Sequence, residues 1–249
     1  MSTSTAFKTV RKQSLSDSVY RQIKDKIVNS ELACGAELPA ERTLSEMLGV
    51  NRGAVREAIK RLQQAGLVAV RQGGNHVVLD YKTEGGLELL SSLLVDAQGS
   101  INPGVARSIL SLRSVLAPDI AAAAAQKGGA RLADNLNAVL RRMRSSAASL
   151  DELQELALEF WSLLVNAGGN IAFRLAFNSM NKTYRSVWPL LTQVMEAEFR
   201  DTDNLQALSD AVRRRDAEAA RACAQKHLAL GSRAMDLMLK QLQKDSRKD

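Results

Sequence analysis

An abrupt change in hydrophobic period falls at Gly66. Upstream of it, apolar residues recur with helical spacing in two short segments, 40–48 and 51–65, and Gly49 separates these segments. Downstream, in 67–80, LVAVR and HVVLD have the pattern of two strands on either side of the turn QGGN. Two helices joined by a tight glycine turn and followed directly by a hairpin are the pattern of a winged helix-turn-helix.

The rest of the chain carries almost nothing but helical patterns. A first helix is predicted over 15–30, and a long one over 170–198. The predicted fold class is therefore mainly α, with an N-terminal winged helix-turn-helix and a C-terminal all-helical bundle. The expected divisions are a flexible N-terminus at 1–14, a winged-helix domain at 15–80, a linker at 81–85, an effector-binding and dimerisation domain at 86–242, and a polar tail at 243–249.

Several functional classes are excluded by what the chain lacks. Two cysteines, Cys34 and Cys223, cannot make a disulfide scaffold, and two histidines, His76 and His227, cannot make a His-rich metal site. The sequence contains no P-loop, G-x-G-x-x-G, G-x-S-x-G or H-E-x-x-H motif. We therefore do not expect an enzyme.

Cellular location is also indicated by the sequence. The first residues lack the apolar core of a signal peptide, and no uninterrupted apolar run is long enough to predict a membrane span. The expected location is the cytoplasm. The net charge of +7 is concentrated toward the front, because residues 1–80 carry +4 and the remaining residues +3. A basic N-terminal module suggests a polyanionic partner.

A basic stripe lies along the second helix of the helix-turn-helix. Arg52, Arg56 and Lys60 fall within about 80° of one another on a helical wheel, beside an apolar stripe. In such a unit, the N-terminal end of the second helix enters the major groove of DNA, where arginine binds guanine or phosphate. A stripe of this kind on its own is more often a solvated face; the Gly49 turn, the Asn51 cap and the Gly-Gly wing favour DNA.

The segment 38–78, LPAERTLSEMLGVNRGAVREAIKRLQQAGLVAVRQGGNHVV, resembles the DNA-binding domain of the GntR superfamily. The LPAER opening, the LGV-x-R turn, the VREAI-x-RL core and the glycine-rich wing match in order and spacing. The resemblance implies double-stranded, palindromic operator DNA as a partner and a homodimer that reads it. The implied DNA-binding positions are Arg42, Asn51, Arg52, Gly53, Arg56, Gln72, Gly73 and Gly74.

The C-terminal part resembles the helical effector domain of the FadR subfamily. That domain usually binds a divalent metal through one aspartate and three histidines. Here the corresponding positions are Ala157, Trp161, Leu205 and His227, so only one ligand remains. One imidazole cannot assemble such a site, and we expect no metal and no other cofactor.

The effector implied by the resemblance is a fatty acid or a fatty acyl-CoA, since 82–94 and 167–185 resemble the fatty-acid-responsive members of the subfamily. A metal-independent regulator that senses a small organic acid is the alternative. Large or deformable side chains on the predicted helices could line an acyl tunnel, with an arginine at its polar end, although such side chains are more often plain core. The candidate effector-binding residues are Arg113, Trp161, Phe177, Met180, Tyr184, Trp188 and His227.

Overall fold

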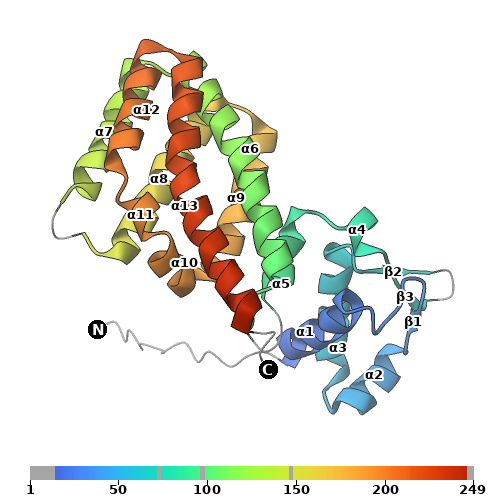
Figure 1. Cartoon of the computed structure of the whole chain (residues 1–249). Helices are drawn as coiled ribbons and strands as arrows, with labels where there is room; N and C mark the ends of the chain where they lie inside the picture. Colours follow the sequence, from blue (N-terminus) through green and yellow to red (C-terminus); the bar gives the residue numbers. More distant parts are fainter. Residues whose placement is uncertain (1–14, 72–73, 96–98, 146–147, 246–249) are drawn as a thin grey trace, which may run out of the picture. The chain divides into compact units, whose positions relative to one another are not determined.

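The computed structural model describes residues 15–71, 74–95, 99–145 and 148–245, and it divides into two compact units, Met1–Leu89 and Leu90–Asp249. The mainly α fold class is confirmed, with a small sheet confined to the first unit (Figure 1). Each unit has its own buried core and is described separately below.

The first unit is a winged helix. Its elements are α1 (Leu15–Val28), β1 (Glu37–Leu38), α2 (Glu41–Leu48), α3 (Arg52–Gln64), β2 (Val68–Val70), β3 (His76–Val78), α4 (Tyr81–Glu84) and the 3₁₀ turn η1 (Leu87–Leu89). The predicted helices and the hairpin are present. The short strand β1 was not predicted; it pairs antiparallel with β3, so the strand order is β1-β3-β2. Two residues are too few to show a period in the sequence.

Local signals explain why the helix-turn-helix forms. Gly49 ends α2 in the left-handed conformation with φ 63°, and the side chain of Asn51 accepts a hydrogen bond from the backbone of Ala54 to begin α3. After α3, Gly66 has φ 67° and lies so close to the carbonyl of Glu84 that a side chain would collide with it. Val55, Ile59 and Leu62 form the buried stripe of α3, as predicted.

The segment 81–85 is partly helical, where the sequence predicted a linker. Asp80 caps α4, because its carboxylate accepts a hydrogen bond from the backbone N–H of Lys82 at 3.0 Å. The first compact unit then continues through η1 to Leu89. The missed signal was the Asp80 cap.

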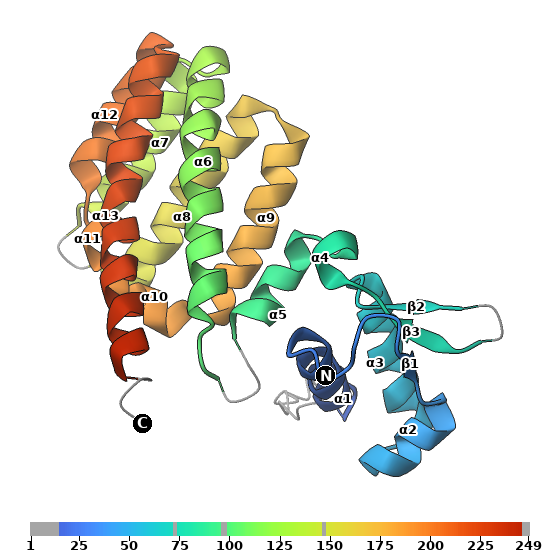
Figure 2. The ribbon, with the colours of Figure 1, turned by 45° about the vertical axis from the view of Figure 1, so that its right-hand side comes forward.

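The second unit is a helical bundle (Figure 2). Its helices are α5 (Leu90–Leu94), α6 (Pro103–Lys127), α7 (Ala130–Met143), α8 (Leu150–Gly168), α9 (Ile171–Ser186), α10 (Trp188–Val194), α11 (Glu196–Phe199), α12 (Thr202–Arg214) and α13 (Ala217–Asp245). Helix α6 packs against α8 and α13, and α12 packs against α7 and α13. Phe160, Leu164 and Leu208 are among the fully buried side chains at the centre.

The single helix predicted over 170–198 is three helices. Val187 leaves the helical conformation with φ −124°, and Pro189 then sits in the first turn of α10. Proline cannot donate the backbone hydrogen bond that would continue α9, whereas the first turn of a new helix tolerates it. Helix α13 is longer than predicted and includes residues 243–245 of the expected tail.

Within the described residues, α6 is long and apolar enough to cross a membrane by length and composition alone. Its apolar 18-residue window has a mean hydropathy of 1.3 and is 44% buried inside the bundle. Alanines supply much of the buried face, including Ala121, Ala124 and Ala125, which lets neighbouring helices approach closely. Its packing against α8 and α13 is that of a core helix.

Candidate DNA-binding surface and effector cavity

The basic side chains predicted to bind DNA are exposed on α2 and α3. Arg42 projects from α2, and Arg52 and Arg56 from the first turns of α3. Arg56 donates from Nε to Oε2 of Glu41 in α2 at 3.1 Å, and its Nη2 atom lies 3.0 Å from the same oxygen. This hydrogen bond and the charge of Glu41 raise the pKa of Arg56 above its ordinary value. Arg56 and Glu41 therefore form an ion pair on the exposed side of α2 and α3.

Asn51 and Gly53 shape the start of α3. The Oδ1 atom of Asn51 accepts from the Ala54 N–H at 2.9 Å, so that oxygen is already used in the cap. A Cβ atom at Gly53 would lie 3.2 Å from the same oxygen. Glycine thus leaves room for the cap that begins α3.

The wing lies between β2 and β3. Two of its predicted contact residues, Gln72 and Gly73, lie outside the described residues. Gly74 has φ 85°, a left-handed conformation that glycine adopts readily and that suits the tip of a turn. Beside it, the Asn75 side chain donates to Glu37 of β1 at 3.1 Å. Sequence analysis missed Glu37, which ties the wing to the third strand.

The second unit contains a mostly apolar cavity of about 70 Å³. Five of the seven predicted effector residues share its wall, namely Arg113, Trp161, Phe177, Met180 and Tyr184. A second cavity of about 40 Å³ is lined by residues of α5, α6, α9, α10 and α13. Both cavities have in their walls Arg113, Tyr184, Leu191 and Met195.

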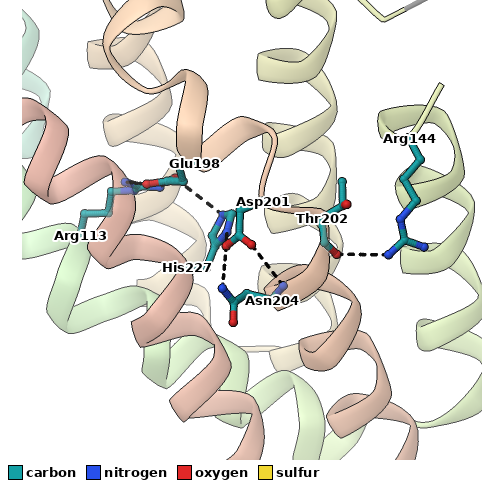
Figure 3. A network of polar contacts seen from close by, with 7 residues as sticks. All are labelled: Arg113, Arg144, Glu198, Asp201, Thr202, Asn204 and His227. Atoms are coloured by element: carbon teal, nitrogen blue, oxygen red, sulfur yellow. Dashed lines mark hydrogen bonds and ion pairs between the residues drawn. The ribbon is translucent and has the colours of Figure 1, made fainter. Parts of the chain in front are cut away.

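Arg113 is paired with a carboxylate. Its Nη1 atom donates to Oε2 of Glu198 in α11 at 2.9 Å, and Nη2 makes a second contact with Oε1 (Figure 3). The side chains are 12% and 2% exposed. Burial is the largest single influence and lowers the pKa of Arg113, but the charge of Glu198, the interaction with Tyr184 and the hydrogen bond to Glu198 together raise that pKa above its ordinary value. The cavity wall thus carries a neutralised ion pair at the arginine that the sequence predicted as an effector contact.

His227 lies behind this ion pair and outside the cavity wall. Its Nε2 atom is 3.8 Å from Oε1 of Glu198, and its Nδ1 atom is 2.9 Å from Oδ2 of Asp201 (Figure 3). Burial alone would raise the pKa of Asp201, but hydrogen bonds from His227 and from Asn204 hold it below its ordinary value. Because the ionised carboxylate can only accept, Nδ1 of His227 carries the proton.

Tyr184 lines both cavities and carries a buried hydroxyl group. Its hydroxyl oxygen is buried and has no hydrogen-bond partner in the described part of the chain. Burial raises the pKa of Tyr184 to about 12, the charge of Arg113 opposes the rise, and the charge of Glu198 adds to it. At neutral pH the hydroxyl is therefore protonated and can donate to a bound molecule.

Trp188 is a predicted effector residue that does not lie with the others. It is absent from the residues that line either cavity, and the guanidinium of Arg185 lies over its ring at 5.1 Å. The break at Val187 starts a new helix, so Trp188 no longer follows the face of α9 that carries Met180 and Tyr184.

The residues at the family's metal positions do not fit a metal. Trp161, Ala157 and Leu205 offer no ligand atom, and Asp201 and Glu198 lie at opposite nitrogen atoms of the His227 ring. Within the described ranges, no group of three or more His, Cys, Asp or Glu side chains is placed to hold an ion. Trp161 packs near His227, with ring centroids 6.4 Å apart.

Glu198 and Gly231 are the components that sequence analysis missed. A Cβ atom at Gly231 in α13 would collide with Oε2 of Glu198. The glycine therefore makes room for the carboxylate that binds Arg113. A glycine inside a 29-residue helix was the available signal, because it costs about 1 kcal/mol relative to alanine and needs a packing reason.

A winged helix joined to a helical domain with an internal cavity is the architecture of a DNA-binding transcriptional regulator. Residues 15–78 match the family model of bacterial regulatory proteins of the gntR family, and residues 108–230 match that of the FCD domain. The chain belongs to the GntR family, with the FadR-type domain combination that the sequence suggested. The family is one of transcriptional regulators, and the expectation that the protein is no enzyme is confirmed.

Three relatives illustrate the relationship. The HTH-type transcriptional regulator Mce2R of Mycobacterium tuberculosis is 36% identical over 94% of this chain and 97% of its own length. The fatty acid metabolism regulator protein of Edwardsiella ictaluri is 27% identical over 72% of each chain. A solved structure of Lar, which controls expression of the Listeria monocytogenes agr system, has a TM-score of 0.57 and 18% identity, with 93% and 98% of the chains covered. This last likeness concerns the fold alone.

Proposed function

We propose that this chain is a cytoplasmic, ligand-responsive repressor that binds a palindromic operator as a homodimer and releases it when a fatty acyl ligand enters the helical domain. One winged helix reads a half-site, and a palindrome mirrors the two-fold symmetry of a dimer. Arg42, Arg52 and Arg56 would contact phosphates and base edges, with the Asn51 amide beside them and the wing at Gln72, Gly73 and Gly74 in the adjacent groove.

The observation that carries the effector proposal is the cavity between α6, α8 and α9. Its wall is almost wholly apolar, and its polar side chains include Arg113, Glu198, Tyr184 and Gln154. Such a wall suits an aliphatic chain with a single polar end. Met180 and Met195 are deformable and can adapt to chains of different shape. Relatives named fatty acid metabolism regulators support the same ligand class.

The two cavities offer more length than either does alone. Arg113, Tyr184, Leu191 and Met195 belong to both walls, so a shift of the flexible Met195 side chain would connect them. An acyl chain that entered both would bridge α6, α9, α10 and α13. By bridging these helices, the ligand would change their packing and favour the state that does not bind DNA.

A small organic acid is the second candidate, and the same geometry disfavours it. A short, highly polar acid would need several donors, and Arg113 is the only basic side chain among the described residues of the two walls. That guanidinium is already bound to Glu198. A short acid would have to replace the apolar contacts of an acyl chain with polar ones, and this requirement distinguishes the two ligand classes.

The test is DNA binding measured against ligand. A duplex selected from a random library by the purified protein would be labelled, and its fluorescence anisotropy followed while dodecanoyl-CoA, dodecanoate or citrate is added, with and without EDTA. We expect the acyl ligands to release the duplex and EDTA to change nothing. Release by citrate alone, or a requirement for divalent metal, would contradict the proposal.

A further inference from the structure

The Arg113–Glu198 ion pair controls the charge of the cavity wall. Both guanidinium nitrogens face the carboxylate, and Glu198 is almost completely buried. Glu198 has little freedom to leave, since the backbone at Gly231 lies against it and His227 lies behind it. Each cavity therefore presents a buried positive charge that is already balanced.

The charges in this wall disfavour binding of a ligand that carries a carboxylate. It would bring a second negative charge to one arginine, next to the carboxylate of Glu198. Burial of a charge without its own partner is costly, and two carboxylates that share a site repel each other. Among the described lining residues, no other basic side chain is available to compensate the added charge.

An uncharged carbonyl group avoids that cost and finds a donor. Tyr184 lines both cavities, and its buried hydroxyl has no partner among the described residues. It can donate one hydrogen bond to the carbonyl oxygen of an ester, an amide or a thioester. A ligand of this kind would satisfy the one orphaned donor of the wall and leave the ion pair intact.

We propose that Glu198 is a specificity-determining residue that makes the cavity select uncharged acyl groups over free carboxylates, with Tyr184 as the donor to the acyl carbonyl. The inference rests on the proposed function, because it presupposes that an acyl chain occupies the cavity. It goes further by naming the chemical class of the ligand's polar end: an acyl thioester, ester or amide.

The experiment compares two ligands with one chain length. Binding of dodecanoate and of the thioester S-dodecanoyl-N-acetylcysteamine to the full-length protein would be measured by calorimetry at pH 7.5 with EDTA. For the wild type we expect the thioester to bind about tenfold more tightly or better. In Glu198→Gln, which removes the competing charge and frees Arg113, we expect dodecanoate to gain and this ratio to fall about tenfold.

Two further variants complete the design. Glu196→Gln makes the same chemical change two residues away, in an exposed ion pair with Arg200, and we expect the wild-type ratio. Tyr184→Phe removes the donor, and we expect the thioester affinity to fall about fivefold. The wild-type protein and Tyr184→Phe both keep the Arg113–Glu198 ion pair. Their measured affinities for the two ligands therefore test the proposal even if Glu198→Gln does not fold.

The outcomes separate the inference from the function on which it rests. Equal binding of the two ligands by the wild type, or preference for dodecanoate, would overturn the inference and leave the acyl-sensing function standing. An unchanged ratio in a folded Glu198→Gln variant would do the same. If neither ligand bound the wild type, the proposed function would fail and the inference would fall with it.

Discussion

The carboxylate of Glu198 occupies the space that a side chain at Gly231 would need. One residue belongs to the short helix α11 and the other to the interior of α13, and their contact fixes the acid that neutralises Arg113. A glycine within a long helix is thereby explained by the ion pair that it accommodates.

Gly231→Ala is expected to destabilise the second unit. Alanine is the better helix former, so a stability loss would show that the added methyl group is crowded by Glu198; we expect about 1–3 kcal/mol in the free energy of unfolding. Chemical denaturation measures it. In a Glu198→Ala background the same change should cost less, because the carboxylate is gone and only the Met195 side chain, with Cε 2.5 Å from the added Cβ, still crowds it. Equal costs in both backgrounds would contradict the contact.

Arg52→Ala and Arg56→Ala are expected to weaken specific DNA binding about tenfold or more, because each removes a cation from the exposed start of α3. Anisotropy with the selected duplex measures the loss, and thermal unfolding checks that the fold is intact. Arg131→Ala removes an exposed arginine from α7 and serves as the matched control. Normal binding by both α3 variants would refute the recognition-helix assignment.

Ala157→Leu is expected to block the effector site without harming DNA binding. Ala157 is buried in the wall of the larger cavity, and the added carbons would occupy part of its 70 Å³. We expect dodecanoyl-CoA to lose its effect on both melting temperature and DNA release. Ala172→Leu makes the same change at an exposed position of α9 and should behave as wild type. A full ligand response in Ala157→Leu would place the effector elsewhere.

Asp201 makes stability dependent on pH in the acid range. Its pKa in the folded protein lies below the ordinary value of 3.8, so its contribution is present above that value and is lost as pH falls through the folded pKa. We expect Asp201→Asn to be less stable than wild type at pH 7 and the difference to shrink at pH 3, as measured by urea unfolding. Asp203→Asn, exposed on the same helix, is the control. A difference independent of pH would contradict this role.

The sequence predicted what is encoded locally. The helix-turn-helix and hairpin were recognisable because Gly49, Asn51 and Gly66 act within a few residues of where they stand. The end of α9 was missed because the helical pattern continues across Val187, although Pro189 was a visible signal. The predicted helix boundary was therefore wrong where a helix-breaking residue lay within a continuing helical pattern.

The effector site was predictable only in part. Arg113, Met180 and Tyr184 came from resemblance and helical spacing, and the structure brings them to one cavity. The pairing of Arg113 with Glu198 joins residues 85 positions apart, and no periodicity relates them. Because that contact depends on tertiary packing, the sequence alone predicted Arg113 as an effector contact and did not identify Glu198 as its partner.

Under the proposed function, an acyl ligand in the helical domain releases operator DNA from a dimer. Native mass spectrometry of the protein with its selected duplex, titrated with dodecanoyl-CoA in the presence of EDTA, tests it directly. The account predicts two chains on each duplex at the start, then ligand-bound dimers free of DNA. Ligand-bound protein that remains on the duplex, or one chain per duplex, would contradict it.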